Sequence, residues 1–318
     1  MSNAKSVLHL VAGNAFQIVC ALALGTIALG LILESWWWPA DAIAQLRLHN
    51  TVVLLVLGIG LAVSRRWKWA TVAAAGIGIS LIFSLPGLIK TAPTGEAADG
   101  KVLRILSHNL NFQNEQFDVA IDAIEAADAD VVILFEITLA WQQALQRLES
   151  IYDFHLVEAE QGQFGIAIFS REEFQYDPEP FSAKGIHPVI AKFKNGSKPF
   201  TVIGVHPPPA IGGELFEIRN RFLDLLAINV QFRNEPVVVA GDFNITPVSR
   251  AYRKLLRETE LRSAGSPLRS TWSLGKIPGM GARIDHHLVS KHWRIASSEV
   301  GPSSGSDHKM LVTDLILE

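Results

Sequence analysis

The 318-residue sequence predicts an α/β domain preceded by an all-α transmembrane region. Two observations lead to this prediction. Long apolar runs fill residues 1–90, where only six Lys or Arg and two Asp or Glu occur. Residues 101–318 instead alternate short apolar runs, typical of buried strands, with longer segments of helical periodicity. Residues 91–100 (TAPTGEAADG), rich in small residues, are the expected linker.

Three apolar runs, at residues 15–33, 51–64 and 70–89, predict about three transmembrane helices. The first has 19 residues, and the tryptophans 36–38 that follow it are typical of a membrane interface. The middle run has only 14 residues, which is short for a span unless residues back to Ile43 join it. A buried helical hairpin in a soluble domain is the alternative interpretation.

A basic connection between the second and third runs predicts the orientation. Arg65, Arg66 and Lys68 favour the cytoplasmic side of a membrane. The N-terminus is then inside, and the domain after Lys90 is extracytoplasmic, either periplasmic or extracellular. If the middle run does not span, that domain is cytoplasmic.

The composition of residues 101–318 argues against some functions. Of the chain's 28 basic and 31 acidic residues, six and four lie before residue 101, so 22 and 27 remain and give a net charge of −5. Duplex DNA is bound mainly through basic residues, so this charge is not typical of a duplex-binding domain. The single cysteine, Cys20, allows no disulfide within the chain and no Cys-based zinc site.

The elements of the domain follow from apolar periodicity and from the residues that interrupt it. Apolar runs of strand length are bounded by Gly, Pro or polar residues; the prolines at 207–209, for example, end one of them. Segments with helical spacing of apolar residues lie between these runs. Strands are expected at 102–107, 130–135, 164–170, 188–193, 200–205, 236–241, 283–290, 294–300 and 310–316, and helices at 119–127, 141–150, 214–230 and 249–257. Arg219 and Arg221 are expected on a solvated helix face.

Polar residues recur where these strands end or in the loops beside them. Asp242 and Asn244 follow the apolar run 236–241, and because alternate residues of an extended chain point the same way, their side chains leave the sheet together. Ligand sites of α/β sheets generally lie at strand ends. The full set is Asn109, Glu136, His206, Asp242, Asn244, Asp285, Asp307 and His308.

Oxygen-bearing members of this set fit a hard divalent cation. Mg²⁺ takes one or two carboxylates together with waters and phosphate oxygens. Glu136 suits that role, and Asn109 and Asp307 complete the predicted ligand set, with Mn²⁺ as the alternative ion. The sequence contains no pair of histidines four residues apart, which argues against zinc.

The remaining members fit the attack of water on a phosphate ester. Asp242 is expected to hold the water, and Asn244 to donate to a phosphoryl oxygen as charge develops. His308, oriented by Asp285, is the expected proton acceptor. His206 either stabilises the same oxygen or protonates the leaving group.

These motifs resemble those of the endonuclease/exonuclease/phosphatase superfamily, which includes deoxyribonucleases, abasic-site endonucleases, sphingomyelinases and inositol-polyphosphate phosphatases. The matching motifs are Gly241-Asp242-Phe243-Asn244, Arg283-Ile284-Asp285-His286 and Gly305-Ser306-Asp307-His308, with Asn109 and Glu136 before them. The resemblance covers about residues 101–318. It implies a four-layer α/β sandwich with two packed mixed β-sheets, and the metal and catalytic roles given above. His206 resembles the extra histidine of the deoxyribonuclease and sphingomyelinase branches. The abasic-site branch has a tyrosine at that position and an acidic residue at the position of Asn111.

The sequence therefore predicts a membrane-anchored, Mg²⁺-dependent phosphoesterase, most readily a phosphodiesterase. Its substrate would be a nucleic acid, a phospholipid or an inositol phosphate, and no obligate protein partner is inferred. A non-catalytic, membrane-tethered binding module and a nuclease facing the cytoplasm are the alternatives. Trp272 is expected to pack beside the site, His108 to be structural, and His286 and His287 to be strand or surface residues.

Overall fold

The computed structural model describes residues 2–89, 91, 102–178, 180–194, 198–275 and 280–318. Most of the expected linker, residues 92–100, lies outside the described residues. The chain divides into two compact units. The first comprises Met1–Ile89, Ala210–Gly213 and Pro247–Arg253, and the second comprises Lys90–Pro209, Glu214–Thr246 and Lys254–Glu318.

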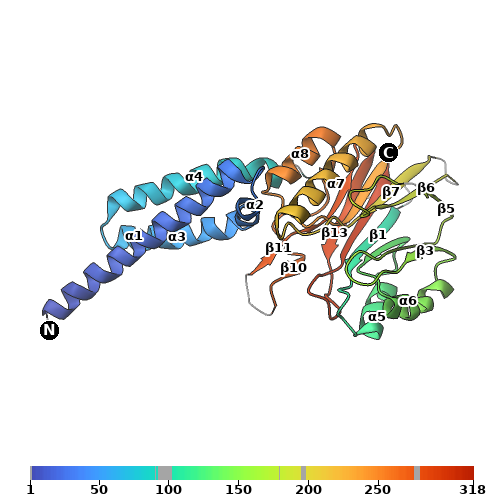
Figure 1. Ribbon diagram of the computed structural model, residues 1–318, viewed down its shortest axis with the longest axis horizontal. Coiled ribbons are helices and arrows are strands. Elements are labelled where there is room, and N and C mark those ends of the chain that lie inside the picture. The colour runs from blue at the N-terminus through green and yellow to red at the C-terminus, as the bar shows by residue number, and fades with distance from the viewer. Residues whose placement is uncertain (1, 90, 92–101, 179, 195–197, 276–279) are drawn as a thin grey trace. The chain divides into compact units, whose positions relative to one another are not determined.

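The first unit is built on four helices (Figure 1): α1 Ser2–Leu33, α2 Trp38–Gln45, α3 Arg47–Val63 and α4 Trp67–Ile89. Segments Asn14–Leu33 and Trp67–Ile89 are long and apolar enough to cross a membrane. Helices α2 and α3, bent by 62° at their junction, make a third candidate if they count as one span. Only 22% and 28% of the two apolar windows are buried, and side chains such as Leu22 and Ile82 are exposed. Such apolar surface is typical of helices that face lipid.

Helix α2 was not expected from the sequence, and α3 begins four residues before the predicted run. Pro39 lies in the first turn of α2, where proline favours helix initiation. Arg47, the first residue of α3, forms a 3.0 Å ion pair with Glu34, and both side chains are 1% exposed. Pairing of these charges makes their burial tolerable, so a charged residue begins an apolar helix.

Two mixed β-sheets of six strands each form the second unit. The first has the order β13-β14-β1-β2-β4-β3 and the second β5-β6-β7-β8-β12-β9. Pairs β1/β2 and β7/β8 are parallel, and the other paired strands are antiparallel. The first sheet consists of β1 Val102–Asn109, β2 Val131–Phe135, β3 Phe154–Glu158, β4 Ile166–Ser170, β13 Trp293–Val300 and β14 Leu311–Leu317. The second consists of β5 Phe174–Tyr176, β6 Val189–Phe193, β7 Phe200–Val205, β8 Val237–Asp242, β9 Arg262–Ser263 and β12 Asp285–Val289, and a separate hairpin pairs β10 Trp272–Ser273 with β11 Gly281–Ala282.

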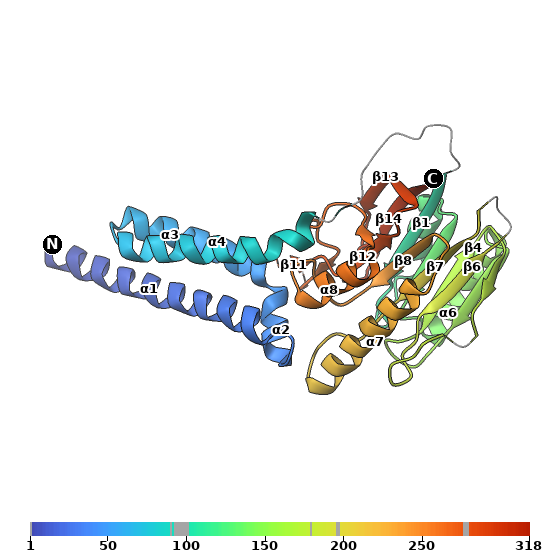
Figure 2. The ribbon, with the colours of Figure 1, turned by 90° about the horizontal axis from the view of Figure 1, so that it is seen from above.

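The sheets pack face to face, with helices outside them. The alternating side chains of strand β2 contact both layers. Ile133 and Phe135 join Val202 and Val238 of the second sheet in one buried cluster. Leu134, of opposite orientation, packs in another cluster with α5 Phe117–Ala127, α6 Leu139–Leu145 and the 3₁₀ helix Gln146–Ser150. Helix α7 Gly213–Gln231 lies along the second sheet (Figure 2), and α8 spans Arg250–Thr259. The predicted four-layer α/β sandwich with two packed mixed sheets is confirmed.

Several local expectations were wrong. The predicted helix 141–150 is an α-helix followed by a 3₁₀ turn, and strands β3, β5 and β9–β11 were not expected. Arg219 is fully buried rather than solvated, with its guanidinium 5.3 Å from the Phe216 ring and hydrogen-bonded to Asn220. For His286 and His287 the expectation of strand or surface residues is confirmed in its first form, since both are fully buried in β12.

Candidate active site

Strand register brings the predicted site residues to one edge of the sandwich. Asn109 and Asp242 are the last residues of β1 and β8, while Glu136 and His206 directly follow β2 and β7. Strand β12 is antiparallel to β8, so its first residue, Asp285, pairs directly with Asp242. Strand β14 is likewise antiparallel to β1, and the loop before it returns His308 to the same edge.

Asn109 links the two sheets at this edge. Its Nδ2 donates to Glu136 Oε1 at 2.9 Å and to Asp242 Oδ2 at 3.2 Å. Its Oδ1 accepts from the Asn111 N–H at 3.0 Å, so the amide orientation is set on both sides. Glu136 Oε2 accepts from the Phe112 N–H at 2.9 Å. Asn109 therefore acts here as a donor between two carboxylates, and each Glu136 oxygen keeps a lone pair available.

Asp242 Oδ2 is the centre of the cluster. Four side-chain nitrogens surround it: Asn109 Nδ2 at 3.2 Å, Asn244 Nδ2 at 3.4 Å, His206 Nε2 at 3.5 Å and His308 Nε2 at 3.6 Å. Burial raises the pKa of Asp242, but the two histidines outweigh that effect and leave the pKa below its usual value. An anionic oxygen is thus the species that this arrangement of donors stabilises.

The backbone around Asp242 is unusually constrained. Gly241 has φ +145°, and a Cβ there would lie 2.1 Å from the Val205 carbonyl oxygen. Asn244 adopts φ +50°, its N–H donates to Asp242 Oδ1 at 2.9 Å, and its Nδ2 also donates to the Pro207 carbonyl at 3.0 Å. Such left-handed residues concentrate at functional sites because they aim side chains that regular structure cannot.

His308 lies between two carboxylates. Its Nδ1 is 2.9 Å from Asp285 Oδ2, and its Nε2 faces Asp242. Because both ring nitrogens face acceptors, the geometry favours the imidazolium form. Burial lowers the pKa of His308, but Asp285 and Asp242 outweigh it and raise the value to about 10. For Asp285, burial dominates and raises the pKa.

His206 completes the cluster from the second sheet. Its Nε2 faces Asp242 and also lies 3.9 Å from Glu136 Oε1. The rings of Phe135 and Phe164 lie 5.6 and 6.1 Å away, and His206 is buried. Its Nδ1 has no hydrogen-bond partner among the described residues. The imidazole is therefore held by packing and by the two carboxylates.

Asp307 is placed differently from its neighbours in the set. It is exposed, and its two oxygens accept from Asn111 Nδ2 and from Trp272 Nε1, both at 2.8 Å. Asp307 thus connects to Glu136 only indirectly, through Asn111 and Asn109. Trp272, expected only to pack, is a hydrogen-bond donor.

The donor set of Glu136 fits a hard divalent cation, since carboxylate oxygens with free lone pairs are what Mg²⁺ prefers. Among the described residues, one group of three ligand atoms from acidic or histidine side chains lies within 4.8 Å: Asp242, Asp285 and His308. A metal there requires a neutral His308. The proton that His308 shares with Asp285 makes hydrogen bonding the better account of that group.

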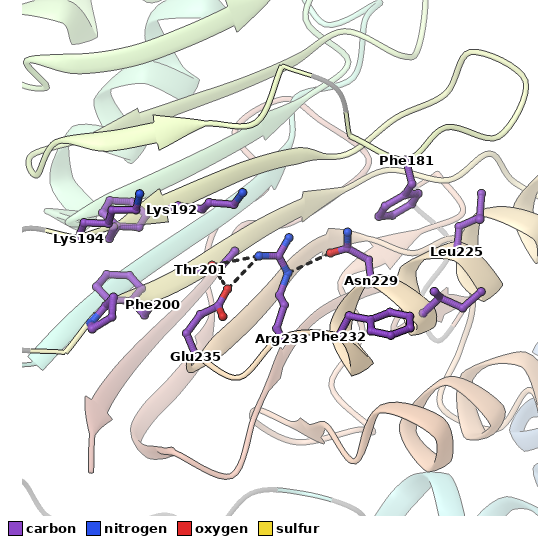
Figure 3. Close-up of a pocket in the computed structure, with 13 residues that line it drawn as sticks. Phe181, Lys192, Lys194, Phe200, Thr201, Leu225, Asn229, Phe232, Arg233 and Glu235 are labelled. Carbon is purple, nitrogen blue, oxygen red and sulfur yellow. Dashed lines mark hydrogen bonds and ion pairs between the residues drawn. The ribbon is translucent and has the colours of Figure 1, made fainter.

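A cavity of about 620 Å³ lies at the other end of the second sheet (Figure 3). It is lined by the first residues of β7, including Phe200, and by Phe232 near the end of α7. Arg233 in its wall is hydrogen-bonded to Glu235 and Asn229. Because a six-residue strand spans about 20 Å, this cavity is remote from His206 at the end of β7. This cavity is therefore separate from the cluster around Asp242.

Sequence reasoning missed the neutral residues that hold the charged ones. Ser306 Oγ donates to the Asn109 carbonyl at 2.8 Å and accepts from the His308 N–H at 3.0 Å. Thr271 Oγ1 accepts from the Asp285 N–H at 3.0 Å. The only sequence signal was position: Ser306 lies inside the Ser-Asp-His motif, and Thr271 precedes Trp272.

Comparison with known proteins agrees with this geometry. The protein-family model described as the Endonuclease/Exonuclease/phosphatase family matches residues 106–308. A search of curated proteins finds no match.

Solved structures share the fold at low sequence identity. The human Nocturnin catalytic domain with bound sulfate is 20% identical, covering 68% of this chain and 95% of that chain, with a TM-score of 0.53. An endonuclease/exonuclease/phosphatase from Bacteroides vulgatus is 20% identical, covering 69% and 100%, with a TM-score of 0.55. One from Beutenbergia cavernae is 17% identical, covering 68% and 72%, with a TM-score of 0.56.

Proposed function

The chain belongs to the endonuclease/exonuclease/phosphatase family, and from this premise we propose that it is a membrane-anchored, Mg²⁺-dependent phosphodiesterase. Proteins of this family typically hydrolyse phosphate esters. The ester hydrolysis is supported by the site, and the membrane anchoring by the apolar helices.

The observation that carries the proposal is the group of four nitrogens around Asp242 Oδ2. A phosphoryl oxygen resembles a carboxylate oxygen in charge and in the hydrogen bonds it accepts. Hydrogen-bond donors that converge on the carboxylate oxygen of Asp242 are also positioned to bind a phosphoryl oxygen beside it. Asn244, His206 and His308 are the proposed donors to the phosphoryl group. The sulfate bound to the Nocturnin catalytic domain is consistent with a tetrahedral anion in this fold.

The attacking water is assigned to Asp242. Its depressed pKa keeps the carboxylate ionised, so Oδ2 accepts a hydrogen bond from water and aligns the water's lone pair with phosphorus. The sequence suggested His308 as the proton acceptor. With both ring nitrogens facing carboxylates, His308 is better placed as a cationic donor to the phosphoryl oxygen, and Asp242 as the proton acceptor.

Glu136 is the proposed principal ligand of Mg²⁺. Asn109, hydrogen-bonded to Glu136, and Asp307, connected to Asn109 through Asn111, would complete the ligand set. A divalent cation bound there neutralises charge on the phosphate and orients it. Mn²⁺ has the same ligand preference and is the alternative ion.

We infer three spans with the catalytic unit outside the cytoplasm. The α3–α4 connection carries Arg65, Arg66 and Lys68, which favour the cytoplasmic side. With α4 as a span, the residues after it then lie on the opposite side, and counting α2 and α3 as one further span puts the N-terminus inside. The substrate is a phosphate ester, with nucleic acid, phospholipid and inositol phosphate as the classes to compare.

Hydrolysis of bis(p-nitrophenyl) phosphate by the detergent-solubilised full chain tests this function. We expect Mg²⁺-dependent release of nitrophenol that a chelator abolishes. Asp242→Asn and His308→Ala should each lower kcat by at least about 100-fold, because each removes a group on which the transition state depends.

Matched control variants are available on the same domain. Asp153→Asn and His155→Ala change exposed residues of the same types and should leave the rate unchanged. A wild-type chain with no turnover on any diester or monoester, at any divalent metal, would favour the non-catalytic binding module instead.

A further inference from the structure

The segment Thr271–Ser273 lies between the two halves of the His308–Asp285 pair. On one side, the Thr271 N–H donates to the Ala282 carbonyl at 3.0 Å, just before β12 begins with Asp285. On the other side, the Lys309 N–H donates to the Thr271 carbonyl at 2.7 Å, and the Ser273 N–H donates to the Asp307 carbonyl at 3.1 Å. Residues 271–273 are therefore hydrogen-bonded to the backbone close to both Asp285 and His308.

The hydroxyl group of Thr271 holds the backbone at the start of β12. Its Oγ1 accepts from the Ile284 N–H at 3.1 Å and the Asp285 N–H at 3.0 Å. Thr271 is fully buried, so water does not compete for this oxygen. Asp285 is thus fixed at its N–H.

Trp272 fixes the other partner. Its Nε1 donates to Asp307 Oδ2, and Asn111 Nδ2 donates to Oδ1, so both oxygens of an exposed carboxylate are held. Trp272 also forms a β-bridge with His308 itself. These contacts fix the position of Asp307 although it is exposed, and they also restrain the adjacent His308.

We propose that Thr271 and Trp272 are positioning residues that hold Asp285 and the Asp307–His308 segment so that His308 Nε2 points at Asp242. This inference rests on the proposed phosphoesterase function. A catalytic imidazole displaced by 1 Å loses about 100-fold in rate, so neutral residues two contacts away from the substrate matter.

Substitutions of Thr271 separate positioning from general stability. Thr271→Val keeps the shape but removes the hydroxyl group; kcat should fall about 10- to 100-fold, as for other supporting residues, with KM within about twofold. Thr271→Ser restores the hydroxyl group and should restore kcat. Thr313→Val is the matched control, because it removes another buried hydroxyl group, bonded to His287 and Ser298, away from the site.

A readout without turnover tests the same inference. In NMR spectra of the chain labelled at histidine, the Nδ1–H proton of His308 should appear downfield because Asp285 accepts it. Thr271→Val and Trp272→Phe should shift or broaden this signal, while Thr271→Ser and Thr313→Val should not.

The inference fails if folded Thr271→Val retains wild-type kcat and an unchanged His308 signal, or if Thr271→Ser loses as much as Thr271→Val. Wild-type inactivity with the expected NMR response would instead refute the proposed function and leave the positioning role intact. The two ideas are thereby separable.

Discussion

At Gly241, just before the central aspartate, strand β8 is crowded by its neighbour β7 and by Phe135 of the first sheet. The backbone has φ +145°, and an added Cβ would meet the Val205 carbonyl oxygen at 2.1 Å and Phe135 Cζ at 2.7 Å. The carbonyl belongs to the parallel β7 and cannot move without breaking the ladder that places His206. Glycine is required here for both conformation and space.

Gly241→Ala should therefore destabilise the chain by about 3 kcal/mol and lower the unfolding temperature by about 10 °C. Activity should fall as well, because Asp242 follows directly. Gly162→Ala is the matched control: φ is +117° but nothing lies within 4 Å of the added Cβ. Equal shifts for the two variants, measured by thermal unfolding in detergent, would refute the steric part of the explanation.

Single residues also show what the sequence could predict. The strand-end positions of Glu136, Asp242 and His308 followed from apolar runs and the residues that end them, and the structure brings these side chains together. The orientation of the Asn109 amide and the bond from Trp272 to Asp307 did not follow, because each depends on a partner far along the chain. Arg219 was misjudged because Phe216, one turn earlier on α7, lies against its guanidinium, and charge alone does not show such a contact between residues three apart on a helix.

Strand β12 contains two histidines, His286 and His287, that are uncharged in the folded protein. Burial, reinforced by Arg283, lowers the pKa of His286 and of His287 to about 3. His287 is hydrogen-bonded on both ring nitrogens, to Thr313 and Ser107. In the unfolded chain each histidine titrates near its ordinary value of about 6.5.

The sign of the pH effect follows from these shifts. Between pH 6.5 and 3 the unfolded state binds more protons than the folded state, so stability is complete above pH 6.5 and decreases with acidification. The unfolding temperature should thus fall between pH 7 and 5. His287→Gln should flatten the fall by about one proton's contribution, 1.4 kcal/mol per pH unit at full effect. His155→Ala, an exposed control, should not alter it. Parallel curves for wild type and His287→Gln would contradict this account.

Elements with their own periodicity were predictable, and those fixed by pairing were not. Strand β2 is five buried apolar residues, so its sequence identifies it. Strand β3 lies at a sheet edge and is only partly buried. Its sequence therefore lacks the alternation of apolar and polar residues that would identify a strand. Strands β9, β10 and β11 have two residues each and exist only because of their partners. The hairpin of β10 and β11 nonetheless places Trp272.

For the whole molecule, the division into an apolar helical part and a strand-rich part was visible in the sequence, while the number of spans depends on α2 and α3. The 62° bend between these helices leaves two or three crossings by length and composition. Helix α4, as a span, separates the α3–α4 connection from the catalytic unit in both cases, whereas a span made of α2 and α3 separates the α1–α2 connection from the α3–α4 connection.

Single-cysteine labelling distinguishes these arrangements. Cys20, the only native cysteine, is buried and can be replaced by serine. Ser35→Cys in the α1–α2 connection, Ser64→Cys in the α3–α4 connection and Ser150→Cys in the catalytic unit then provide exposed probes. With three spans, a membrane-impermeant maleimide should label Ser35→Cys and Ser150→Cys in intact cells, and Ser64→Cys only after permeabilisation, because the basic connection stays inside. Reversal of Arg65, Arg66 and Lys68 to glutamate should weaken this asymmetry. Labelling of Ser35→Cys and Ser64→Cys from the same side would show that α2 and α3 do not form a span.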